Sequence, residues 1–108
     1  MLAKISAERG IMLSGMKRDQ TEASFSGESL QPADAILIAS DLQFMAVLTD
    51  LNLRNNSIGP EGAIAIAEAL KVNAVLTKLN LEYNNLGDAG KKAVRDAVKG
   101  RSGFVLEL

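Results

Sequence analysis

The chain repeats itself with a period of 28 residues. The stretch LTDLNLRNNSIGPEGAIAIAEALKVNAV, residues 48–75, is followed by LTKLNLEYNNLGDAGKKAVRDAVKGRSG, residues 76–103. Leucines, an asparagine and glycines coincide in the two copies at Leu48/Leu76, Leu51/Leu79, Leu53/Leu81, Asn56/Asn84, Gly59/Gly87 and Gly62/Gly90. Self-similarity of this period is the signature of a solenoid, in which each unit packs against its neighbours along one axis.

Each unit joins a strand pattern to a helix pattern. Leu51 and Leu53, flanked by polar residues, predict a short strand. After the Asn-Asn turn, Gly62, Ile66 and Leu70 recur every four residues, which predicts an amphipathic helix. Strands joined through a helical crossover must run parallel. The sequence therefore predicts an α/β fold: a short right-handed solenoid with a parallel sheet on its concave side and helices on its convex side.

Two further segments precede the intact units. Residues 21–47 align with the central unit at the same offset and predict a decayed first repeat, in which Glu28 replaces the loop asparagine. Residues 1–20 do not follow the repeat, and their apolar residues at roughly helical spacing predict an N-terminal helical cap. A targeting or partner-docking helix is the alternative for that segment. The repeat domain is expected to cover residues 21–108.

One carboxylate falls on the inward face of the decayed repeat. Helical geometry directs Asp41 toward the core, where a carboxylate needs a partner or a raised pKa. We expect Asp41 to turn toward the N-terminal cap and pair with Lys4 or Arg9.

Composition narrows the range of functions. A formal charge of -1 gives no support to binding of nucleic acid or of an anionic membrane surface. The chain has no cysteine and no histidine, so disulfides, the commonest metal ligand and the usual general base are missing. The segment 87–92 lacks the glycine spacing and the Ser/Thr of a Walker motif. We expect a soluble cytoplasmic protein that is no enzyme, with no metal or cofactor and no membrane span.

The two intact units resemble leucine-rich repeats of the ribonuclease-inhibitor type, whose pattern is LxxLxLxxNxLGxxG followed by a helix. The resemblance covers residues 21–108, with fewer repeats than such horseshoes usually have. It implies a concave parallel sheet and the binding of a partner protein, which is what most members do. It also implies that Asn56 and Asn84 form a structural ladder along the loops. Ran GTPase-activating proteins belong to the same family, so regulation of a small GTPase remains a further alternative.

Polar residues between the strand leucines are expected to face the concave surface. The candidate partner-binding residues there are Asp50, Asn52, Arg54, Asn55, Lys78, Asn80, Glu82 and Tyr83. Neighbouring strands lie about 4.8 Å apart, so two opposite-charge pairs are expected, Asp50 with Lys78 and Arg54 with Glu82. Such pairs either hold the strands in register or form part of an interface. Arg54 and Tyr83 are the expected anchors, because arginine and tyrosine are enriched in hot spots.

The last residues predict a terminal strand with one unpaired edge, made of Phe104, Val105, Leu106, Glu107 and Leu108. Such an edge is a template for pairing with another chain. In the last helix, Lys91 and Arg95 replace Ala63 and Ala67 of the central helix, which predicts a polar cap on the helical layer. The predicted function is non-catalytic protein binding through the concave sheet, the C-terminal edge, or both. The alternative is an assembly subunit that self-associates through that edge or docks in a larger complex.

Overall fold

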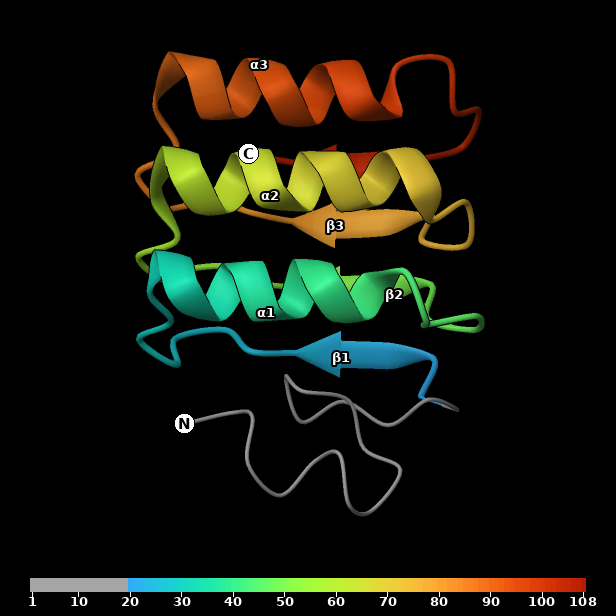
Figure 1. Cartoon of the computed structure of the whole chain (residues 1–108), viewed down its shortest axis with the longest axis horizontal. Coiled ribbons are helices and arrows are strands. Elements are labelled where there is room, and N and C mark those ends of the chain that lie inside the picture. Colours follow the sequence, from blue (N-terminus) through green and yellow to red (C-terminus); the bar gives the residue numbers. More distant parts are fainter. Residues whose placement is uncertain (1–19) are drawn as a thin grey trace.

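Strands and helices alternate along the whole described part of the chain. The computed structural model describes residues 20–108, so the expected helical cap lies outside the described residues apart from Gln20, as do Lys4 and Arg9. The elements are β1 (Glu22–Ser24), α1 (Pro32–Leu42), β2 (Asp50–Asn52), α2 (Gly59–Val72), β3 (Lys78–Asn80), α3 (Gly87–Val98) and β4 (Val105–Glu107). The helices lie side by side in one layer and the strands form the layer behind them (Figure 1).

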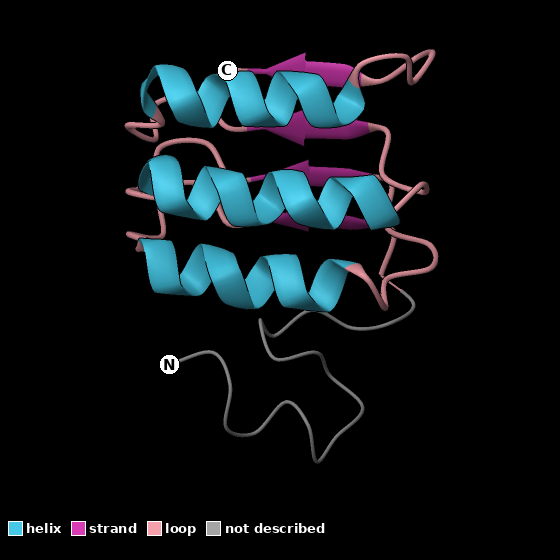
Figure 2. Cartoon of the chain, turned by 45° about the horizontal axis from the view of Figure 1, so that its top comes forward, coloured by secondary structure: helices cyan, strands magenta, loops and turns pink. Residues whose placement is uncertain are grey.

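The four strands form one parallel sheet in the order β1-β2-β3-β4. Ala23 pairs with Leu51, Leu51 with Leu79, and Leu79 with Leu106. The paired residues are 28 positions apart in the sequence for the first two pairs and 27 apart for the last pair, as the sequence predicts. Figure 2 shows the helices covering one face of this sheet. The expected α/β solenoid with a parallel sheet is therefore confirmed, and residues 21–47 fold as a complete strand–turn–helix unit.

Side-chain alternation places the strand leucines in a single core. Leu51 and Leu79 are fully buried, and Ile38 and Ile66 cover them from the helical layer in the same hydrophobic cluster. Because successive strand side chains point to opposite faces, the polar neighbours of each leucine must face outward. The core therefore fixes which residues the concave surface displays.

Small residues let the helices approach one another closely. A Cβ atom added to Gly62 of α2 would lie 2.5 Å from Ile58 Cγ2 and 2.9 Å from Ala35 Cβ of α1. The equivalent Gly90 of α3 has its nearest contact, the Cβ of Ala63, at 3.1 Å. In α1 the same position is Asp34, whose carboxylate instead accepts a hydrogen bond from the N–H of Gln31 at 2.9 Å. Glycine is thus used at this position where one described helix packs against another.

Replacing the two helical glycines with alanine tests this packing. Gly62→Ala should destabilise the fold by about 1–3 kcal/mol through overpacking, even though alanine favours a helix by about 1 kcal/mol. Gly90→Ala gains the same helix propensity and meets looser contacts, so it should cost less. Urea unfolding measures both changes. A Gly62→Ala protein as stable as the Gly90→Ala protein would contradict the proposed close approach of α1 and α2.

Candidate protein interface

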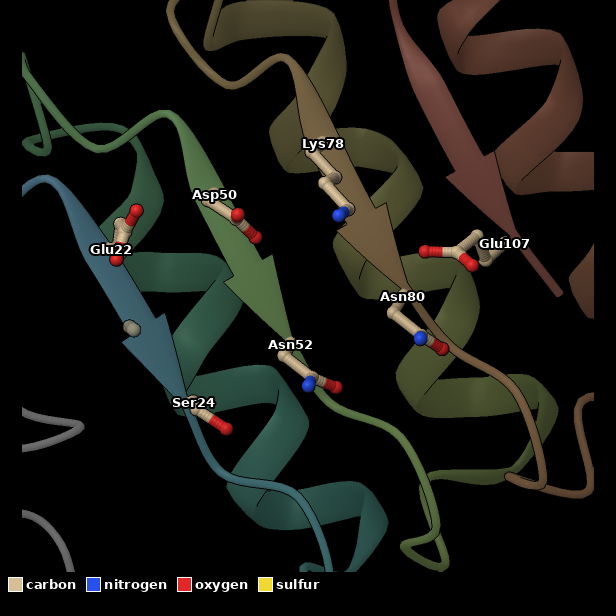
Figure 3. A pocket seen from close by; sticks show the side chains of 8 residues that line it. Glu22, Ser24, Asp50, Asn52, Lys78, Asn80 and Glu107 are labelled. Atoms are coloured by element: carbon tan, nitrogen blue, oxygen red, sulfur yellow. The ribbon is translucent and has the colours of Figure 1, made fainter.

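The concave face presents rows of polar side chains that run across the strands. A hollow of about 380 Å³ lies on this face. Figure 3 shows it from close by, with side chains from all four strands around it. Its lining residues are Glu22, Ala23, Ser24, Asp50, Asn52, Lys78, Asn80 and Glu107. Four of the candidate binding residues therefore lie around one hollow: Asp50, Asn52, Lys78 and Asn80.

One expected charge pair lies in register without forming an ion pair. Asp50 lies opposite Lys78 where β2 pairs with β3, and it lies opposite Glu22 where β2 pairs with β1. Among the described residues, no ion pair within 4.0 Å joins Asp50 to Lys78. An exposed lysine gains little from such a pair, because the ammonium group is already solvated. These charged groups thus remain open to solvent.

Two asparagines at the strand ends have fixed side-chain orientations. Asn52 Oδ1 accepts a hydrogen bond from the N–H of Arg54 at 3.0 Å, and Asn80 Oδ1 accepts one from the N–H of Glu82 at 3.0 Å. Bonds of this kind, two residues along the chain, are typical of Asx turns. Because each oxygen is engaged, the amide NH₂ groups are the free ends that the concave face displays.

Arg54, Glu82 and Tyr83 form a cluster at the rim of the concave face, which we call the rim cluster. Arg54 Nε lies 3.5 Å from Glu82 Oε1. The guanidinium carbon of Arg54 also lies 5.0 Å from the centre of the Tyr83 ring. Asn55 is beside the cluster and donates its backbone N–H to the carbonyl of Glu82 at 2.8 Å. The expected Arg54–Glu82 pair therefore forms, and it also supports an exposed aromatic ring.

Tyr83 has a backbone conformation that its side chain does not favour. Its φ is 59°, and the equivalent residues of the earlier repeats, Asn55 and Gly27, have φ values of 60° and 66°. Glycine and asparagine tolerate this left-handed region, whereas a bulky residue there is an outlier. The 28-residue alignment already contained this signal, because it places Gly27, Asn55 and Tyr83 at one position.

The loop asparagines bond the backbone of the repeat before them. Asn56 and Asn84 are both buried. Asn56 Oδ1 accepts hydrogen bonds from the N–H groups of Glu28 and Leu30, both at 3.0 Å, and its amide NH₂ donates to the carbonyl of Phe25 at 2.9 Å. Asn84 Oδ1 accepts from the N–H of Ile58 at 3.3 Å, and its NH₂ donates to the carbonyl of Leu53 at 2.8 Å. Buried loop backbone needs such partners.

A second set of inter-repeat bonds lies at the other end of the strands, and sequence reasoning missed it. Asn73 donates to the carbonyl of Leu42 at 2.7 Å, at the end of α1. Arg101, which is 28 residues later, donates to the carbonyls of Leu70 at 3.1 Å and Asn73 at 2.9 Å, and also to that of Leu76. Its guanidinium carbon lies 4.9 Å from the centre of the Phe104 ring. The sequence signal for these bonds is that Asn73 and Arg101, two polar residues 28 positions apart, each follow the end of a helix.

The structure places the terminal strand at Val105–Glu107, shorter than the expected 104–108. It pairs with β3 on one side, and within residues 20–108 no strand pairs with its other side. Val105 is 49% exposed, and Phe104, Leu106 and Leu108 are partly buried against the core. This end of the sheet is thus an apolar edge.

The convex face is apolar over α1 and α2 and charged over α3. Ile36, Phe44, Ile64 and Val72 are exposed on the helical side. In α3 the position of Ile64 is taken by Lys92, whose ammonium group lies 2.7 Å from Asp96 Oδ2. That hydrogen bond lowers the pKa of the exposed Asp96 and raises the pKa of Lys92.

Residues 20–108 lack the features of a metal site and of a membrane span. In this part of the chain, no group of three or more aspartate and glutamate residues is arranged to hold a metal ion. No helix in the same segment combines the length and the apolar character needed to cross a bilayer.

Asp41 is 2% exposed, so it does lie on the inward side of α1.

Replacement of Arg101 tests the second set of bonds. Arg101→Ala should destabilise the fold by about 1.5–3 kcal/mol, because three partly buried carbonyls lose a charged donor. Arg101→Lys should recover only part of this, because an ammonium group lacks the planar fork of a guanidinium. Thermal and urea unfolding give these values. The neighbouring exposed Lys99→Ala is the control, and an Arg101→Ala protein as stable as that control would refute the structural role.

Comparison with known proteins agrees with the repeat architecture. A family model described as Leucine Rich repeat matches residues 45–67 and 72–94. The first match covers β2 and the first part of α2, and the second covers β3 and most of α3. No curated protein matches the chain. Together with the parallel sheet and the helical layer, the family match identifies residues 45–94 as leucine-rich repeats within a short leucine-rich-repeat solenoid.

Proposed function

We propose that this chain is a non-catalytic module that binds a partner protein through its concave sheet surface. Leucine-rich repeats are in general protein-interaction modules, and a polar, solvated sheet face over a rigid core supports this role. We also assign the repeats to the ribonuclease-inhibitor type, because each 28-residue unit of the chain contains a full α-helix.

The observation that carries the proposal is the conformation of Tyr83. A bulky residue in the left-handed region costs of order 1 kcal/mol, and the two equivalent positions use glycine and asparagine. Tyr83 is 68% exposed, so burial does not compensate for this strain. Strained residues that packing does not explain are concentrated at functional sites. A strained, exposed tyrosine at the rim of the sheet is therefore best explained as a contact residue.

The surroundings of Tyr83 suit an interface anchor. Arg54 supports one face of the ring, and Glu82 balances the charge of Arg54. The oriented amides of Asn52 and Asn80 add hydrogen-bond donors next to this cluster. An aromatic anchor with polar groups beside it is the usual arrangement of a hot spot and its rim.

The same geometry weighs against regulation of a small GTPase. An arginine finger must be free to approach the phosphates of the nucleotide. Arg54, the concave arginine, is held by Glu82 and by the Tyr83 ring. The arrangement favours a binding surface over a catalytic cation.

The substitution Tyr83→Asn, which copies Asn55 of the preceding repeat, tests the proposal. The fold should be at least as stable as before, because relief of about 1 kcal/mol of strain exceeds the loss of about 0.5 kcal/mol of cation–π attraction. Affinity for the partner should fall by about 2 kcal/mol, roughly thirtyfold, if Tyr83 is a hot spot. The partner is identified by co-purification from the source cells, and its affinity is then measured by calorimetry.

The exposed Lys71→Ala on the convex side is the matched control and should leave the affinity unchanged. Arg54→Ala, which removes the support of the ring, should weaken binding in the same direction as Tyr83→Asn. A purified partner that binds both rim variants as tightly as the native chain would show that the concave surface is not the binding site.

A further inference from the structure

The C-terminal end of the solenoid combines an open strand edge with a charged helix flank. Within the described residues, β4 pairs with β3 alone, so the outward N–H and C=O groups of its other edge have no strand partner. Leu106 pairs with the buried Leu79 and points toward the core, yet Leu106 and Leu108 are only partly buried. An apolar edge of this kind is suited to adding a strand from another chain.

The helix beside this edge differs from the other helices at the positions that face the next repeat. In α2 these positions are Ala63 and Ala67, which are buried beneath α3. In α3 they are Lys91 and Arg95, and Lys99 follows one turn later. We call Lys91, Arg95 and Lys99 the basic flank.

The basic flank has an excess of positive charge. Asp88 in the first turn of α3 and Glu82 line the same hollow as Lys91, and Glu82 is already paired with Arg54. The carboxylate of Asp96 is already engaged by Lys92 on the convex side. Among the described residues, no ion pair within 4.0 Å involves Lys91, Arg95 or Lys99. Lys91 and Arg95 are therefore available to a partner, whereas Lys99 lies near Asp96 and helps to lower the pKa of that carboxyl group.

We propose that β4 and the basic flank together form a docking site for an extended acidic segment of a partner protein, which adds to the sheet as a fifth strand. Backbone hydrogen bonds to the edge of β4 give this contact affinity, and leucine-like side chains on the inner face of the segment cover Leu106 and Leu108. Acidic side chains on the same inner face reach Lys91 and Arg95. This site adjoins the rim cluster, because Glu82 and Tyr83 line one hollow together with Lys91 and Leu108. It is built from other residues and does not depend on the function proposed above.

Charge also argues against a second copy of the chain as the occupant. Pairing of β4 with β4 of another molecule about a two-fold axis brings the two basic flanks to the same interface. Lys91 and Arg95 would then face positively charged groups rather than carboxylates, and like charges placed opposite each other are destabilising. Self-association through β4, which the sequence left open as an alternative, is therefore disfavoured. An acidic strand is complementary both to the open edge of β4 and to the basic flank.

Two matched peptides test this site on the whole chain. The probes are a blocked synthetic peptide, Glu-Ser-Leu-Ser-Leu-Ser-Glu, and its counterpart with lysine in place of both glutamates, so that the charged residues and leucines share one face. Binding is followed by NMR of the isotope-labelled chain. The acidic peptide should shift the amide signals of Val105–Leu108 and of α3, and should bind at least tenfold more tightly than the basic peptide. Its affinity should fall as salt is raised.

Charge reversal provides the decisive comparison. The double variant Lys91→Glu with Arg95→Glu should prefer the basic peptide, whereas Lys71→Glu with Lys92→Glu, the same charge change on the convex face, should retain the original preference. Circular dichroism confirms that each variant is folded. Equal binding of the two peptides, unshifted β4 signals, or a stable dimer in sedimentation at the same concentration would overturn the proposal. Loss of peptide binding in Asn52→Ala, a change on β2, would also overturn it, by placing the peptide on the concave face away from β4.

Discussion

Hydrogen bonding of buried loop backbone is the constraint on which the rest of this structure depends. Each of the first two turns between a strand and a helix lies against the turn of the next repeat, and its polar backbone groups must find partners there. Asn56 and Asn84 provide these bonds at one end of the strands, and Asn73 and Arg101 provide them at the other. Each unit is therefore bonded to its neighbour at both ends, so the repeats cannot slide past one another without leaving buried groups unsatisfied, which costs about 1–3 kcal/mol for each group.

This fixed register determines the concave surface. A slip of one residue would exchange buried leucines for the polar residues between them, so the inward side chains also specify the outward ones. Asp50 lies opposite Lys78, and Asn52 lies opposite Asn80, because Leu51 pairs with Leu79. The Asx bonds then orient the amides of Asn52 and Asn80, and the ion pair with Glu82 holds Arg54 beneath the Tyr83 ring. The surface is consequently rigid before any partner arrives, which reduces the entropy lost on binding.

The period of the sequence was sufficient to predict the fold, because it determines which residues share a face. The parallel sheet, the inward leucines and the 27-residue last step all follow from the spacing of Leu51, Leu79 and Leu106. Features that depend on side-chain conformation could not be predicted in this way. The spacing of residues does not predict that Asp50 and Lys78 form no ion pair. It also does not predict that Arg101 turns inward and donates to backbone carbonyls while Lys99 faces solvent. The strain at Tyr83 was visible only as a substitution at an aligned position, and its meaning required the value of φ.

Departures from the repeat indicate where a residue has a different neighbour. Gly62 and Gly90 lie where one helix packs on another, and Asp34 occupies the same position in α1, where it caps its own helix. Lys91 and Arg95 replace buried alanines at the flank that no described helix covers. Tyr83 replaces glycine and asparagine at a position whose backbone favours small or amide side chains. The first of these departures is explained by contacts within the fold. Lys91 and Arg95 form no ion pair among the described residues, and the contact of Tyr83 with Arg54 is weaker than the strain at Tyr83. For this reason the two proposed interfaces are placed at these two departures.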